Sequence, residues 1–120
     1  GYSPKILSEY LAPLLAENET FIGGLGITRF YLRPDQGMID HQFNIAFQQQ
    51  FGKEPTFLDK LQYFQPNNRT IRYLVLNPDH RGEQIESINF KQQYKPLKIL
   101  KLKDQEVALI YDLENLEINS

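Results

Sequence analysis

The 120-residue chain has no cysteine, no tryptophan, one methionine and only two histidines. Without cysteine, these residues have no disulfide, no thiol nucleophile and no thiolate metal ligand. Such a composition is common in intracellular proteins, so we expect a cytoplasmic location. His41 and His80 lie too far apart in the sequence to predict a zinc site by their spacing.

The chain also has no strong excess of charge of one sign and no long apolar run. The formal net charge is only -2, and the lysines and arginines are scattered along the chain. A nucleic-acid surface needs clustered basic side chains to neutralise phosphates, so we expect no nucleic-acid partner. No apolar run approaches the length that crosses a bilayer, so we expect no membrane insertion by this segment.

The residues that are present describe one soluble globular domain. Hydrophobic residues make up 41% of the chain and charged residues 23%, which is ordinary for a folded protein with a single core. Near the start, Ser3-Pro4 is a helix-start signal, and an apolar stripe with helical spacing follows it. Pro13 lies inside this pattern and should kink or restart the helix. The stripe must cover either the domain's own sheet or a partner.

The stretch from Ile27 to Gly52 predicts a β-hairpin followed by a helix. Residues 27–33 are rich in β-branched and aromatic side chains, and Asp35-Gln36-Gly37 provides a tight turn before a short return strand at 38–40. Phenylalanines then recur with helical spacing from Phe43 to Phe51, and Gly52 marks the helix end.

The middle of the chain is less regular. Thr56 should cap a short helix that reaches Leu61. Thr70 to Asn77 is ambiguous, because its β-branched and aromatic residues favour a strand whereas its apolar spacing also fits a helical face. The glycines at 23, 24 and 26 raise the alternative of a phosphate-binding loop, but the Lys-Ser/Thr pair and the helix that such a loop requires do not follow.

Period-two alternation governs the last third of the chain. It runs from Ile85 to Tyr94 and again from Leu97 to Lys103, and Val107 to Leu113 is strongly apolar. A turn is expected at Lys103-Asp104 or Asp104-Gln105. The pattern predicts an antiparallel meander of three strands.

These motifs together resemble a PAS domain. The resemblance rests on the hairpin order, on Asn44 before Ala46-Phe47 with Phe51-Gly52 after it, and on the ending Ile110-Tyr111-Asp112-Leu113-Glu114. It implies an α+β fold with a five-stranded antiparallel sheet and short helices on one face. Residues 1–20 would form an amphipathic flanking helix and residues 21–120 the PAS-like domain. In this order of elements Thr70 to Asn77 is a helix.

A narrower resemblance concerns Leu100 to Gln105, which is similar to the L-x-L-K-G-Q segment of the PAS-like domain associated with H-NOX haem sensors, with Asp104 in place of the glycine. This implies a non-enzymatic homodimerisation and signal-relay module without a cofactor of its own. The parent chain would be a longer signalling protein such as a sensor histidine kinase of a two-component system. An H-NOX sensor domain or protein and an output domain would be its partners.

Two sets of candidate residues follow from these expectations. The predicted dimer interface combines the terminal apolar stripe with the outer face of the meander: Ile6, Leu7, Tyr10, Leu11, Leu14, Leu15, Leu100 and Leu102. The alternative function is the sensing of a small molecule or haem in an aromatic pocket, for which the candidates are Phe43, Phe47, Phe51, Phe90 and Tyr111. Some PAS domains hold haem through a histidine in the region of His80, but His80 lies in a Pro-Asp-His-Arg-Gly turn, which favours a solvent-facing side chain over a haem ligand. We find no pairing of nucleophile and base that predicts catalysis.

Overall fold

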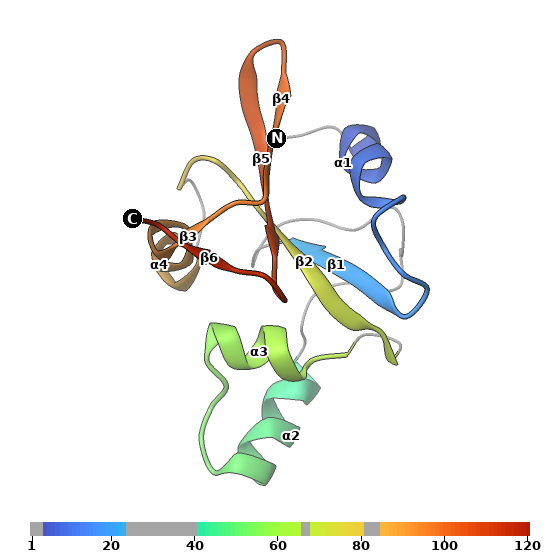
Figure 1. Ribbon diagram of the computed structural model, residues 1–120. Helices are drawn as coiled ribbons and strands as arrows, with labels where there is room; N and C mark the ends of the chain where they lie inside the picture. The colour runs from blue at the N-terminus through green and yellow to red at the C-terminus, as the bar shows by residue number, and fades with distance from the viewer. Residues whose placement is uncertain (1–3, 24–40, 66–67, 81–84) are drawn as a thin grey trace.

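The computed structural model describes residues 4–23, 41–65, 68–80 and 85–120 (Figure 1). The described residues form an α+β fold. The helices are α1 (Pro4–Leu11), α2 (His41–Phe51), α3 (Phe57–Tyr63) and α4 (Ile85–Gln93). The strands are β1 (Glu19–Gly23), β2 (Thr70–Leu76), β3 (Tyr94–Lys95), β4 (Lys98–Leu102), β5 (Gln105–Asp112) and β6 (Glu117–Ile118). The predicted hairpin at 27–40 lies outside the described residues.

The main sheet contains four strands in the order β1-β2-β5-β4, and β3 pairs with β6 in a separate two-stranded ribbon. β1 and β2 run parallel, whereas the other pairs in the sheet are antiparallel. The expected five-stranded antiparallel sheet is therefore wrong for the described residues. Parallel strands require a long crossover, and α2 and α3 lie in the connection that returns the chain to the same end of the sheet.

β2 corrects the predicted helix at Thr70 to Asn77. Ile71 and the run from Tyr73 to Leu76 are all buried, so both faces of this central strand are covered. A strand buried on both faces reads as a continuous apolar run without alternation. Its β-branched and aromatic residues favoured a strand, as the structure shows. The order of elements in PAS domains, which the sequence resembles, favoured a helix instead.

α4 corrects the first predicted strand of the meander. Ser87 and Phe90 are buried at i, i+3 spacing, and their neighbours on both sides are more exposed. Glu86 in the first turn and Lys91 in the last turn complement the helix dipole. In a segment of nine residues, nearly the same apolar positions fit the alternation of a strand and the spacing of a helix. This ambiguity explains why the sequence predicted a strand here.

The other two strands of the meander are confirmed as the β4–β5 hairpin. Lys103 and Asp104 occupy its turn with φ values of 51° and 65°, and Leu102 pairs with Gln105 directly below them. A two-residue turn with two positive φ values matches the right-handed twist of the strands. In Figure 1 the hairpin extends away from the rest of the molecule.

The helix predictions around residue 50 are also confirmed. α2 ends at Gly52, whose φ of 72° is readily adopted only by a residue without a Cβ and whose N–H donates to the carbonyl of Gln48 at 2.8 Å. At the start of α3, Thr56 Oγ1 accepts from the N–H of Asp59 at 3.1 Å. Asp59 Oδ2 accepts from the N–H of Thr56 at 3.0 Å, completing a capping box.

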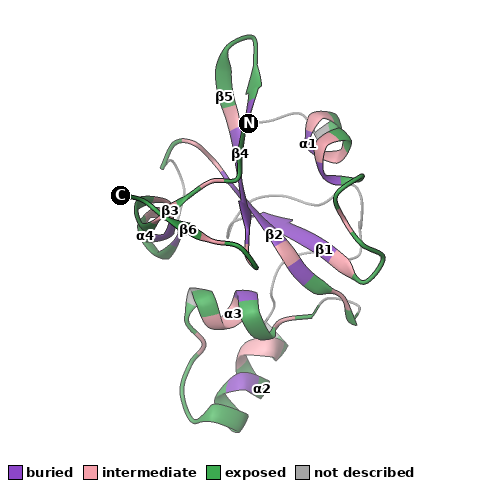
Figure 2. Cartoon of the chain, in the orientation of Figure 1, coloured by how far each residue is buried: buried purple, intermediate pink, exposed green. Residues whose placement is uncertain are grey.

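One hydrophobic core joins the sheet to residues from α1, α3 and α4. Leu11 of α1 and Leu74 of β2 are both fully buried in it, and Leu61 and Phe90 enter it from α3 and α4. Figure 2 shows this buried material concentrated along β1, β2 and the lower part of β5, while most of α2 is exposed. The predicted division between residues 20 and 21 falls inside β1.

Candidate functional site

The residues predicted at a dimer interface are mostly turned into the chain's own core. Leu7 and Leu11 are 4% and 0% exposed, and Leu100 is buried too. Ile6, Tyr10 and Leu15 are partly buried against the same core. Only Leu14 and Leu102, which lie on separate segments, are substantially exposed. Of the two uses foreseen for the α1 stripe, the structure shows the covering of its own sheet.

The five aromatic residues predicted to line a pocket separate into two groups. Phe43, Phe47 and Phe51 follow one another along α2 and contact aromatic rings of α3 or the segment just after it. Phe90 instead packs edge-on against Tyr111 at 5.0 Å in the core of the sheet. The structure does not bring the five residues together into one pocket.

A charged cluster that the sequence did not single out joins three strands of the sheet. Arg72 on β2 binds Asp112 on β5 with two hydrogen bonds, Nε to Oδ1 at 2.7 Å and Nη2 to Oδ2 at 3.0 Å. Its Nη1 donates to Glu19 Oε2 on β1 at 2.9 Å and lies 3.2 Å from Glu114 Oε2. The signal was a single arginine inside an otherwise apolar strand, because a buried charge requires partners.

These contacts also stabilise the charged forms. The hydrogen bonds from Arg72 are the main cause that lowers the pKa of Asp112 to about 2, with further bonds from the Asn115 amide and the Glu114 N–H. The two carboxylates raise the pKa of the Arg72 guanidinium. With every charge paired, the cluster holds β1, β2 and β5 together as a structural clamp.

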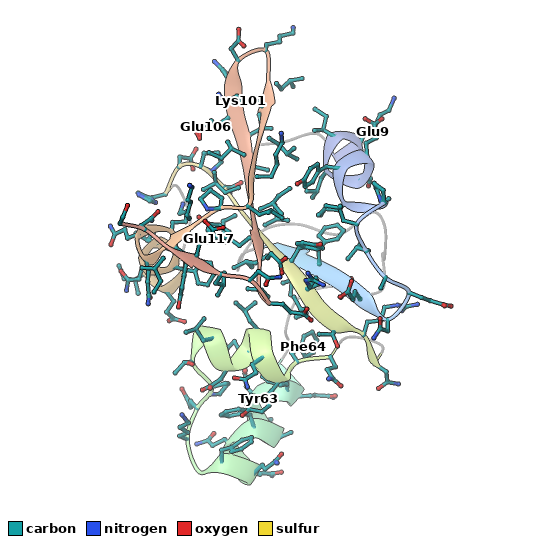
Figure 3. The ribbon with its side chains drawn as sticks, viewed as in Figure 1. Glu9, Tyr63, Phe64, Lys101, Glu106 and Glu117 are labelled. Atoms are coloured by element: carbon teal, nitrogen blue, oxygen red, sulfur yellow. The ribbon has the colours of Figure 1, made fainter. Side chains whose placement is uncertain are left out.

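The α2–α3 pair forms an aromatic unit beside the sheet. Phe47 is buried between the rings of Phe51, at 4.4 Å, and Tyr63, at 5.7 Å. Phe43 packs edge-on against Phe64 at 5.4 Å. Figure 3 shows Tyr63 projecting from α3 toward α2 and Phe64 just beyond the end of α3. Aromatic contacts of this kind fix how the two helices lie against each other.

The opposite face of α2 is exposed and carries no charge. We call it the outer stripe of α2; its members, spaced as one helical face, are Gln42, Ile45, Ala46 and Gln49. No Asp, Glu, Lys or Arg occurs anywhere in α2, and Ile45 is 43% exposed. Solvent-facing helices usually carry charged side chains on their outer face. An uncharged exposed helix with an apolar residue at its centre is typical of a surface that another molecule covers.

Two hollows lie next to this unit. The smaller, of about 160 Å³, is lined by residues of α2 and of the segment 54–60: Asn44, Ile45, Gln48, Glu54, Pro55 and Lys60. The buried Oδ1 of Asn44 accepts no hydrogen bond from the described part of the chain. The larger, of about 450 Å³, is an open groove between α3, the start of β2 and the segment after β5. Leu61, Ile71 and Leu116 form part of its apolar wall, and Glu114, whose carboxylate lies 3.2 Å from Arg72 Nη1, also lines it.

The segment after β2 contains His80, for which the sequence favours a solvent-facing side chain over a haem ligand. It is exposed, and the segment is fastened to α4 by Lys91, whose Nζ donates to the carbonyls of Asn77 at 2.8 Å and Asp79 at 2.7 Å. Within the described ranges, no three His, Asp or Glu side chains gather as metal ligands would. None of the described helices has the length and apolar character to cross a bilayer.

Comparison with known proteins adds no relative: no family model, no curated protein and no solved structure matches this chain. A proposal for its function therefore rests on the sequence motifs and on the geometry described above.

Proposed function

We propose that this chain is a regulatory domain of a larger signalling protein and that it acts by pairing with a second copy of itself through α2. The observation that carries the proposal is the uncharged outer stripe of α2, with Ile45 exposed at its centre. In a twofold dimer a residue near the axis meets its own copy, so any charge there would face a like charge. A helix without charged residues avoids this repulsion.

The small side chain of Ala46 supports close packing of two such helices. It is exposed beside Ile45, and the hollow next to Ile45 offers space for a side chain of the second copy. The glutamines of the stripe can donate to and accept from their own copies across the axis.

The size of α2 sets the strength of the contact. Two helices of this length would bury on the order of 600 Å² in total, below the ~1,200 Å² at which stable complexes begin. Pairing of the isolated domain should therefore be weak, with a dissociation constant on the order of micromolar or higher. In a longer chain, additional contacts would raise the effective concentration of one domain near the other. Reversible pairing suits a domain that relays a signal.

The resemblance to PAS domains, including the H-NOX-associated subtype, supports the same class of function through sequence motifs only. The parallel β1–β2 pair departs from the antiparallel sheet of that family, so the proposal does not depend on membership in it. It does move the predicted contact from α1 to α2, since the stripe of α1 is buried in the chain's own core.

The test measures the molecular mass over a concentration series by light scattering or sedimentation velocity. It compares the wild type with two variants that carry the same change, glutamine to arginine, at different positions. Gln49→Arg places a charge on the outer stripe, whereas Gln93→Arg places the same charge at the exposed end of α4. We expect the wild type and Gln93→Arg to show the same dimer at high concentration, and Gln49→Arg to weaken it at least about tenfold, because like charges would meet at the axis. A wild type that stays monomeric, or a Gln49→Arg variant that pairs like the wild type, would refute the proposal.

A second candidate function is binding of a small apolar molecule in the groove of about 450 Å³ between α3 and β2. Its size and its mixture of apolar wall and carboxylate are those of a small-molecule site. A ligand in this groove would raise the melting temperature of the wild type, and Leu58→Trp, at an exposed position that lines the groove, would abolish the increase by filling part of it. A ligand whose stabilisation survives that substitution binds elsewhere.

A further inference from the structure

β4 forms one edge of the four-stranded sheet, and no other described strand pairs with its outer side. Alternate residues of an edge strand direct their backbone N–H and C=O groups away from the sheet, where they remain available to another strand. Ile99 and Leu102 are 37% and 45% exposed, so apolar side chains accompany this free backbone. Figure 2 shows the outer part of the hairpin exposed on both strands.

Lysines lie among these apolar residues on both faces of β4: Lys101 shares a face with Ile99, and Lys98 shares the other face with Leu102. Lys98 and Lys101 on β4 and Lys103 in the turn are all exposed. Lys101 lies opposite Glu106 of β5, and Figure 3 shows the two side chains on the projecting hairpin. Among the described residues, none of these three lysines is within ion-pair distance of a carboxylate. The side chain of Lys98 lies over the Tyr10 ring, with Nζ 6.0 Å from the ring centroid. The edge therefore combines a strand side that no described strand covers, apolar side chains and lysines that form no ion pair within the described residues.

The charge identifies the kind of strand that fits this edge. A second copy of β4 would bring several lysines against one another, and lysines on edge strands are a known protection against such self-pairing. The same lysines attract carboxylates, and opposite charges across adjacent strands stabilise the pair. The edge is thus selective against its own copy and in favour of an acidic strand.

We propose that β4 is a docking site for an extended segment with alternating acidic and apolar side chains, which adds to the sheet as a fifth strand next to Ile99 to Lys103. The backbone of the segment would bond the free edge, its carboxylates would pair with Lys101 and Lys103 on one face of the strand, and its apolar side chains would cover Leu102 on the other face. This site is separate from α2, so a paired domain could hold one such segment on each copy.

The test uses a synthetic peptide of alternating glutamate and valine, long enough to span β4, at low ionic strength. A peptide of alternating lysine and valine controls for charge, and the acidic peptide N-methylated at every second residue controls for backbone pairing. The protein variants are Lys101→Gln/Lys103→Gln on the edge and Lys5→Gln/Lys53→Gln, which remove the same charge from exposed positions elsewhere. Binding is measured by calorimetry, and circular dichroism verifies that each variant is folded.

We expect the acidic peptide to bind, the lysine peptide and the N-methylated peptide not to bind, and Lys101→Gln/Lys103→Gln to weaken binding about fivefold to tenfold. The Lys5→Gln/Lys53→Gln variant should bind like the wild type. Equal binding of the N-methylated peptide would show attraction by charge alone and overturn strand addition. Absence of peptide binding also overturns the proposal, and binding instead to vesicles of phosphatidylserine would assign the hairpin to an anionic lipid surface.

Discussion

Arg72 and Asp112, forty positions apart in the chain, form a bidentate pair at 2.7 and 3.0 Å across the β2–β5 boundary. Their side chains are 21% and 10% exposed, so the pair is largely removed from water. The same guanidinium reaches Glu19 on β1. One side chain therefore connects the parallel pair of the sheet to its antiparallel part.

Replacing Arg72 should destabilise the domain markedly. Arg72→Leu leaves the carboxylates of Glu19 and Asp112 without their cation in a partly buried site, and we expect a loss of about 2–3 kcal/mol in the free energy of unfolding. Arg72→Lys keeps the charge but loses the bidentate geometry, so its loss should be smaller. Urea denaturation measures both values. A loss below about 0.5 kcal/mol for Arg72→Leu would show that the clamp contributes little.

The lowered pKa of Asp112 predicts a loss of stability in acid. Because the pKa is about 2 in the folded state and near 4 in the unfolded state, the unfolded state takes up the proton first as the pH falls. The contribution of this group, about 2 kcal/mol, is complete above about pH 5 and is lost between about pH 4 and pH 2. We expect the free energy of unfolding, measured by denaturation at several pH values in this range, to depend less on pH in Asp112→Asn than in the wild type. A wild-type slope that survives in the variant would assign the effect to other carboxylates.

Asn119 should hold the C-terminal segment against α4. Its Nδ2 lies 3.3, 3.0 and 3.1 Å from the carbonyls of Lys91, Gln92 and Tyr94, at the end of the helix where such groups lack internal partners. Asn119→Ala should cost about 1 kcal/mol and open β3–β6 before the main sheet. Hydrogen exchange would detect this as faster exchange in the ribbon alone. Unchanged protection there would contradict the role assigned to the amide.

The β4–β5 turn offers a stabilising change. Lys103 and Asp104 both have positive φ, a region that asparagine and glycine adopt with less strain. Lys103→Asn with Asp104→Gly should raise the free energy of unfolding by about 1 kcal/mol. Lys95→Asn, an exposed position on β3, serves as the control and should bring no gain. A double variant no more stable than wild type would mean that the native turn is already relaxed.

The sequence predicted those parts of the fold whose signals are local. The capping box at Thr56, the glycine that ends α2 and the β4–β5 hairpin each depend on residues a few positions apart. The parallel pairing of β1 with β2 joins residues about fifty positions apart, with α2 and α3 in the connection, and no local pattern encodes it. β2 is a strand because it lies at the centre of the sheet, between β1 and β5, and this position is likewise a tertiary property.

For the candidate site, too, the sequence predicted the local arrangement but not the tertiary one. The spacing of Phe43, Phe47 and Phe51 placed them on one helical face, and the structure confirms this grouping. Their separation from Phe90 and Tyr111 depends on which face of the molecule each helix covers. The uncharged character of α2 was visible in the sequence, but its significance required the knowledge that the helix is exposed.

The most direct test of the central claim uses the absence of cysteine from the chain. A single cysteine at position 46 or 49, on the outer stripe of α2, can form a disulfide only with another molecule, and an equivalent cysteine at position 93 on α4 measures random collision. We predict that Ala46→Cys or Gln49→Cys forms covalent dimers under mild oxidation much faster than Gln93→Cys, with unchanged circular dichroism. Equal rates at the three positions would contradict pairing through α2.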